Sequence, residues 1–205
     1  MLFSTFFRLL GMIFPLLVLG GCQPTLMVMA PADFEPQATA DKALVVFIRP
    51  TLIGGMAQPF VYALRDEGDD VFAGVVYPET KVAYLAEPGE HLFMLVSANT
   101  DFLAANLQAG KRYYVLVTPR TAVLESRYSL LPIRNDVNAK DSVQSEQLRI
   151  WNRSTRWVVI GPKARGWYQD NIESVRARKR EHLPKWQSKS AADRARLTLR
   201  SMDGL

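Results

Sequence analysis

Short apolar runs separated by turn signals dominate the chain from residue 42 to residue 134. The runs are rich in β-branched and aromatic residues, and clusters such as Pro88-Gly89-Glu90 and Ala109-Gly110-Lys111 lie between them. Runs of this length and spacing predict strands joined by tight turns. The expected strands are residues 43–49, 60–64, 71–76, 81–85, 91–97, 102–107, 113–118 and 128–133. We therefore expect a mainly β protein, an antiparallel β-sandwich of the Ig-like or prealbumin-like kind with a C-terminal helical tail packed on it, rather than alternating βαβ units.

Several of these runs are apolar at every position rather than at alternate positions. Leu44-Val45-Val46-Phe47-Ile48 and Leu92-Phe93-Met94-Leu95-Val96 are the clearest cases. A strand with one face in water should alternate, so a continuous apolar run indicates that both faces are covered. The sequence therefore predicts that another part of the chain packs over the outer face of the sheet.

The C-terminal tail, residues 138–205, is the expected cover. It holds all four tryptophans, and because such large aromatic side chains are usually buried, we expect the tail to pack against the domain. A helix is predicted after Gly161-Pro162, with Pro184 expected to end or kink it and Lys179 expected to turn its charge outward. Ser190-Ala191-Ala192-Asp193 predicts the start of a second, short helix. The apolar stripe of the first helix contains Tyr168, Ile172, Val175, His182, Leu183 and Trp186.

The N-terminal segment, residues 1–21, has the pattern of a secretory signal. One positive charge, Arg8, precedes an apolar stretch from Leu9 to Leu19 that is too short to span a bilayer comfortably. Leu19-Gly20-Gly21-Cys22 follows and resembles the lipobox of bacterial lipoproteins. The resemblance implies cleavage before Cys22 and acylation at that residue, which is expected to give lasting membrane attachment. An uncleaved N-terminal anchor is the alternative. By analogy with lipoprotein sorting, Gln23 favours the outer membrane with the protein facing the periplasm.

Composition divides the remaining chain into three parts. Residues 22–41 contain several prolines and little patterned hydrophobicity, which is typical of a tether; residues 42–137 form the expected β-sandwich domain. Residues 23–137 carry 9 Lys/Arg against 13 Asp/Glu, a balance of −4, whereas residues 138–205 carry 15 against 7, a balance of +8. The 48% hydrophobic content is that of a globular protein.

Pro88-Gly89-Glu90-His91 with its following strand, and Gly110-Lys111-Arg112-Tyr113-Tyr114, carry a family resemblance. They resemble small bacterial lipoprotein domains of unknown function that are related in appearance to PEGA-type domains and to the prealbumin-like sandwich. The opening Val45-Val46-Phe47-Ile48-Arg49-Pro50 fits the same pattern. The resemblance implies a fold and a location, and it brings no catalytic residues to this chain.

Arg176, Arg178, Lys179 and Arg180, here called the basic cluster, are the strongest candidate for an anionic contact. Each such charge contributes about 1 kcal/mol near an anionic membrane. The alternative is a solvated helix face whose charges only maintain solubility.

Other candidate sites are expected to be structural. Asp66, Glu67, Asp69 and Asp70, the acidic turn, lack the ligand spacing of an EF-hand and predict a solvated hairpin turn rather than a calcium site. His91 lacks a nominated nucleophile, and Tyr113 and Tyr114 should point to opposite faces of one strand. With one cysteine and two histidines in the chain, no catalytic residue, metal site or cofactor is expected.

We expect a non-enzymatic cell-envelope lipoprotein that acts as an interaction or scaffolding module. Its partners would be the membrane, through Cys22, and an envelope protein or anionic polymer; nucleic acid is not expected for an exported protein. A carrier of a small apolar ligand between sheet and helices is the first alternative, and an envelope hydrolase is the second. What lies beneath the tail helices should discriminate among them, because a carrier needs a cavity and an enzyme needs convergent titratable groups.

Overall fold

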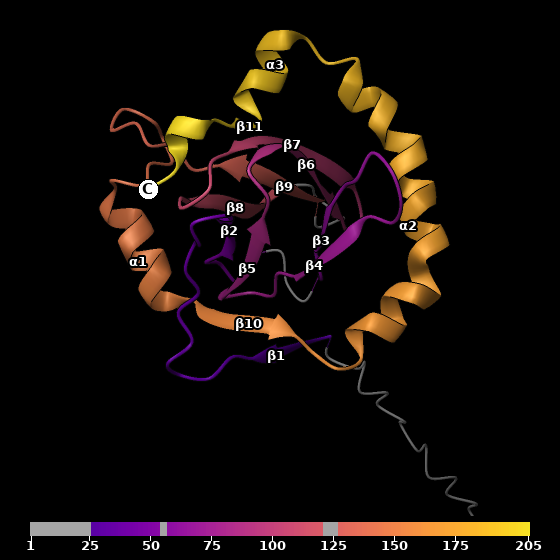
Figure 1. The fold of residues 1–205 in the computed structure, drawn as a ribbon, viewed down its shortest axis with the longest axis horizontal. Coiled ribbons are helices and arrows are strands. Elements are labelled where there is room, and N and C mark those ends of the chain that lie inside the picture. Colours follow the sequence, from indigo (N-terminus) through magenta and orange to yellow (C-terminus); the bar gives the residue numbers. More distant parts are fainter. Residues whose placement is uncertain (1–25, 54–56, 121–126) are drawn as a thin grey trace, which may run out of the picture.

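The computed structural model describes residues 26–53, 57–120 and 127–205, which form two mixed β-sheets (Figure 1). The first sheet has the order β1 (Met27–Met29), β10 (Arg156–Ile160), β5 (Thr80–Ala86), β2 (Ala43–Arg49), β8 (Arg112–Arg120) and β9 (Arg127–Pro132). The second has the order β11 (Thr198–Leu199), β7 (Thr100–Leu107), β6 (Gly89–Val96), β3 (Phe60–Ala63) and β4 (Val71–Val75).

All eight strands predicted from the apolar runs are present, with ends within two residues of the expected ones. The turns between them use glycine where the backbone requires it. Gly89 and Gly110 have φ angles of 116° and 77°, a region that L-residues with a side chain rarely adopt. The β-sandwich-like fold of the sequence prediction is therefore confirmed at this coarser level.

The expectation of purely antiparallel sheets is not confirmed. β2 pairs with β8 in parallel, as do β10 with β5 and β11 with β7. The reason is topological: after β2 the chain crosses to the other sheet and back twice before β8, so two neighbouring strands need not be joined by a hairpin.

Both faces of the first sheet are buried at β2, as its continuous apolar run predicted. All seven residues of β2 are buried. Val45 and Phe47 point into the core between the sheets, where Phe47 meets Phe93 of β6 edge to face at 5.2 Å. Leu44, Val46 and Ile48 belong to a second apolar cluster on the opposite face. Apolar side chains therefore pack on both faces of β2, in the inner core on one side and in the outer cluster on the other.

The C-terminal tail supplies that cover by passing around the β body, as the orange to yellow part of Figure 1 shows. α1 (Glu146–Ser154) places Leu148 and Trp151 in the outer cluster on the first sheet. α2 (Ala164–Gln187) packs on the outer face of the second sheet. α3 (Ala191–Arg196) and the short 3-10 helix η1 (Ser201–Asp203) follow. The tail is not wholly helical, because it also contributes β10 and β11.

The predicted helix ends are partly confirmed. α2 continues three residues beyond Pro184, to Gln187, so the proline lies inside its last turn. α3 begins after Ser190, whose hydroxyl accepts a hydrogen bond from the backbone N–H of Asp193 at 3.0 Å, as the capping pattern predicted.

The segment predicted as a tether is folded onto the domain over its described part, residues 26–41. β1 pairs with β10, and Trp157 donates a hydrogen bond to Glu35 at 3.1 Å. Arg112 forms an ion pair with Glu35 at 3.1 Å and donates to the carbonyl of Pro36. Extended pairing and polar contacts with β10 and β8 thus replace the free linker that composition suggested.

A buried carboxylate near the C-terminus joins the end of the tail to the segment that follows β9. Asp203 is fully buried and accepts hydrogen bonds from Arg134 and Arg200, each at 2.8 Å. Arg134 also donates to the carbonyls of Thr198 and Arg196. Burial alone would raise the pKa of Asp203, but the hydrogen bonds from Arg200 and Arg134 outweigh it and hold the pKa below its ordinary value.

The signal segment and Cys22 lie outside the described residues. Within the described ranges, no helix combines the length and the apolar character needed to cross a membrane.

Candidate binding site beneath helix α2

Two members of the basic cluster are held by the acidic turn. Arg176 forms ion pairs with Glu173 and, at 2.5 Å, with Asp69. The Lys179 ammonium group lies 2.7 Å from the carboxylate of Asp70, and this carboxylate is almost fully buried. The expectation that Lys179 turns its charge outward to solvent is therefore wrong, because its ammonium group is bound by the carboxylate of Asp70 on the neighbouring hairpin.

The acidic turn joins β3 to β4 and fixes α2 on the second sheet. Asp70 accepts a hydrogen bond from the backbone N–H of Arg65 at 3.0 Å, and its carbonyl accepts one from the Tyr168 hydroxyl at 2.5 Å. The turn is thus a hairpin as predicted, but it is only partly solvated. In the described part of the chain no three His, Cys, Asp or Glu side chains are placed to hold a metal ion.

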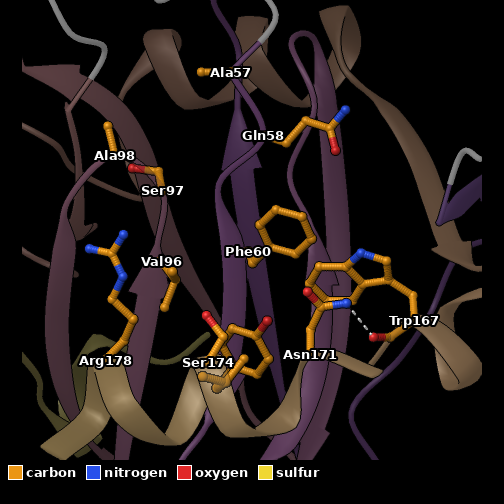
Figure 2. Close-up of a pocket in the computed structure, with 12 residues that line it drawn as sticks. Ala57, Gln58, Phe60, Val96, Ser97, Ala98, Trp167, Asn171, Ser174 and Arg178 are labelled. Carbon is orange, nitrogen blue, oxygen red and sulfur yellow. Dashed lines mark hydrogen bonds between the residues drawn. The ribbon is translucent and has the colours of Figure 1, made fainter. Parts of the chain in front are cut away.

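A cavity of about 430 Å³ lies between the first half of α2 and the outer face of the second sheet. Phe60 of β3 and Trp167 of α2 stack on one side of it, with ring centroids 4.5 Å apart and planes inclined by 11°. Figure 2 shows Trp167 and Arg178 on opposite sides, with Phe60 and Val96 between them. The volume falls in the range of about 300–1,000 Å³ that is typical of small-molecule sites.

Local structure explains why these rings line a cavity. Along β3, Phe60 and Tyr62 point outward, while Val61 points into the inner core. On α2, Trp167, Asn171, Ser174 and Arg178 recur at intervals of three or four residues, so they share the face toward the sheet. Asn171 donates a hydrogen bond to the carbonyl of Trp167 at 2.8 Å, which leaves its amide at the cavity wall.

Arg178 is the member of the basic cluster that lines this cavity. It is half-buried, and unlike Arg176 and Lys179 it makes no hydrogen bond or ion pair with any residue in the described ranges. A guanidinium group presents several donors in a planar fork that suits carboxylate, sulfonate or phosphate groups. The cavity therefore combines aromatic walls with one cationic group that has no described protein partner.

The remaining polar groups of the cavity are neutral. Burial raises the pKa of Tyr62, so its hydroxyl stays protonated at physiological pH. Gln58, Ser97, Asn171 and Ser174 supply hydrogen-bonding groups without charge. Among the described lining residues Arg178 is thus the only one with a formal charge, and an anionic group is its natural complement. Arg180, the fourth member of the basic cluster, is exposed and is not part of the wall.

A second, wider hollow of about 860 Å³ lies under the C-terminal half of α2. Three of its charged residues are in ion pairs: Lys42 with Glu87 at 3.1 Å, and Lys179 with Asp70, which lies outside the lining. His91 contacts the carbonyl of Glu87 at 2.7 Å and stacks on Phe93. Among the described residues that line this hollow there is no serine, threonine or cysteine, and the structural role of His91 stays a prediction.

Tyr113 and Tyr114 point to opposite faces of β8, as predicted. Tyr113 lies in the inner core and Tyr114 in the outer cluster. The Tyr113 hydroxyl accepts a hydrogen bond from the backbone N–H of Gln108 at 2.9 Å and donates one to the carbonyl of Ser201 at 3.1 Å. These tyrosines therefore form no joint aromatic surface.

The density of positive charge in the sequence predicts the basic cluster but not the aromatic wall. From the sequence, Trp167 is one of four tail tryptophans and Phe60 is part of an expected strand. A tryptophan in the first turn of the predicted helix was the available signal for the aromatic wall.

No model of a known protein family matches the chain, and no curated protein is significantly similar to it. The site therefore rests on its own geometry.

Proposed function

We propose that the protein is a lipid-anchored, non-enzymatic binding module of the bacterial cell envelope. Acylation at Cys22 would hold it at the outer membrane, facing the periplasm, and the β-sandwich would be of the PEGA-like or prealbumin-like kind. The signal pattern of residues 1–21 and the lipobox-like Leu19-Gly20-Gly21-Cys22 support the location. The two-sheet body supports the fold at the coarser level.

The cavity beneath α2 is the observation that carries the binding role. The stacked rings of Phe60 and Trp167 offer an apolar wall, and Arg178, which pairs with no residue of the described ranges, offers a cation across from it. This chemistry suits a ligand with a flat or ring-shaped apolar body and one anionic group. Of the functions expected from the sequence, the carrier of a small ligand therefore has stronger geometric support than the scaffolding module. The sequence suggested an apolar ligand, and we propose that the ligand also has an anionic group.

Replacing Arg178 by glutamine is expected to weaken binding of 8-anilinonaphthalene-1-sulfonate by about tenfold or more, because a hydrogen bond to a charged group is lost. Binding of the uncharged analogue N-phenyl-1-naphthylamine should be unchanged. Probe fluorescence measures both affinities, in a chain that lacks residues 1–22 and keeps every described element.

Arg180→Gln is the matched control, because it removes the same charge two residues away from an exposed position. If both substitutions weaken the sulfonate probe equally, the effect is one of net charge and the proposed site is wrong. If the wild-type protein binds neither probe, the binding role of the cavity is refuted.

Scaffolding of an envelope complex is the second candidate, supported by the +8 balance of residues 138–205 and the exposed Arg180. In intact cells, covalent crosslinking of the full-length protein is expected to recover the same partner from wild type and from Arg178→Gln, and less of it from Arg180→Gln. If the partner is lost only with Arg178→Gln, the partner contacts the cavity instead. Truncation near residue 138 is unsuitable, since it removes β10 and β11 from the sheets.

A further inference from the structure

The folded body begins very close to the proposed lipid anchor. Leu26 is almost fully buried, and its carbonyl accepts a hydrogen bond from the backbone N–H of Gly161 at 2.7 Å. Four residue steps separate Cys22 from Leu26, and at about 3.6 Å per step they span at most about 14 Å. A domain of this size has a radius of gyration of about 16 Å, so its diameter exceeds that reach. The anchor therefore restricts which side of the body can approach the membrane.

The surface next to Leu26 has an exposed apolar side chain at its centre. Ile160, at the end of β10, is 49% exposed; Val28 of β1 is 40% exposed but points to the opposite face of the sheet, because Met27 rather than Val28 pairs with Ile160. A hollow beside Ile160 is lined by Ile160, Pro162 and Arg165. Gly161 lets the chains approach closely here, because a Cβ atom at that position would lie 2.9 Å from the carbonyl oxygen of Leu26.

The rim of this surface is positively charged. Lys163 and Arg165 are both exposed, and residues 157–169 contain no acidic residue. α2 begins here without a side-chain cap and without an acidic residue in its first turn, so its free N–H groups add to the positive potential. Asp170 is the first acidic residue further along the helix. Exposed apolar groups surrounded by cations are typical of surfaces that contact phospholipid head groups.

We propose that this surface, made of Ile160, Pro162, Lys163 and Arg165, lies against the phospholipid head groups of the membrane that holds the anchor. The proposal rests on the proposed acylation of Cys22, which brings the membrane within reach. Trp167, which lines the cavity, lies one helical turn after Ala164. The aromatic wall of the cavity therefore begins near the proposed membrane contact.

Nitroxide quenching in vesicles tests the orientation. Lys163→Cys and the matched control Lys189→Cys place single exposed thiols beyond opposite ends of α2, about 36 Å apart along the helix. Acylation blocks the native thiol of Cys22, so a thiol-reactive nitrobenzoxadiazole dye labels only the new cysteine. The full-length protein is reconstituted in vesicles of phosphatidylethanolamine and phosphatidylglycerol that contain a head-group nitroxide lipid. The label at Lys163→Cys is expected to lose most of its fluorescence, and the label at Lys189→Cys almost none.

The outcomes separate the two proposals. Intact-mass measurement first establishes whether Cys22 is acylated; an unmodified thiol would refute the anchor itself. With acylation present, equal quenching at both positions would overturn the membrane contact while leaving the anchor intact. The Lys163→Cys label could instead be shielded to a degree that rises with protein concentration and does not depend on the nitroxide lipid. That result would assign the surface to a second copy of the chain, which also overturns the proposal.

Discussion

Replacing Asp203 by alanine is expected to lower the free energy of unfolding by about 3 kcal/mol, because removing one member of a buried ion pair leaves the other charge uncompensated. Asp203 is fully buried between Arg134 and Arg200, and the Arg134 side chain is itself only 16% exposed. The same carboxylate accepts the backbone N–H of Arg200 at 2.8 Å. Urea unfolding at pH 7, comparing the midpoint and slope of the two proteins, measures the loss.

Asp69→Ala is the matched control, because it breaks an exposed ion pair with Arg176 and should change stability little. The pH dependence gives a second readout with Asp203→Asn. Since the folded-state pKa of Asp203 is lowered from 3.8, its stabilising effect is present at pH values above 3.8 and is lost as the pH falls through the lowered value. The stability gap between wild type and Asp203→Asn should therefore shrink only in that acid range. A gap that stays constant down to pH 2 would contradict the assigned contacts.

Replacing Arg49 by alanine is expected to cost about 3–5 kcal/mol, from the empty volume and from backbone carbonyls left without donors. The Arg49 guanidinium is fully buried at the end of β2. It donates to the carbonyls of Ala57 at 2.8 Å and of Val76 and Ile53 at 3.4 Å, and it lies 4.7 Å from the ring centre of Tyr128. Urea unfolding again supplies the measurement.

Arg49→Met separates the two contributions, since it fills most of the volume but donates no hydrogen bonds. It should be less destabilising than Arg49→Ala and still clearly destabilising. Arg127→Ala, an exposed arginine at the start of β9, is the control and should have a small effect. Equal losses for Arg49→Met and Arg127→Ala would show that the carbonyl contacts contribute nothing.

The strands could be predicted because their signal is local. Apolar runs bounded by Gly, Pro and Asp gave all eight central strands, and the continuous run of β2 indicated two covered faces. β10 was missed, although Trp157-Val158-Val159-Ile160 is an apolar run, because it lies in a segment interpreted as helical. α1 was missed because Leu148 is its only buried residue, and the cap at Ser145 was the remaining signal. Parallel pairing depends on contacts between distant segments and has no local signature.

The candidate site was predictable only in part, for the same reason. The density of positive charge identified the basic cluster, but each assignment within it depends on a partner far away in sequence. Arg176 meets Asp69 and Lys179 meets Asp70 across more than a hundred residues. Arg178, which no pattern in the sequence distinguishes from its neighbours, instead lines the cavity with Phe60 and Trp167. Its role follows from the helix phase relative to the sheet, which only the folded structure provides.

The position of β10 and β11 has a consequence for biogenesis. β10 separates β1 from β5 in one sheet, and β11 borders β7 in the other, so the last fifty residues complete both sheets. If the proposed export proceeds from the N-terminus, strand edges would stay unpaired until these last residues leave the translocation channel. Folding would then follow secretion rather than accompany it, and the unpaired edges would be open to aggregation during that interval.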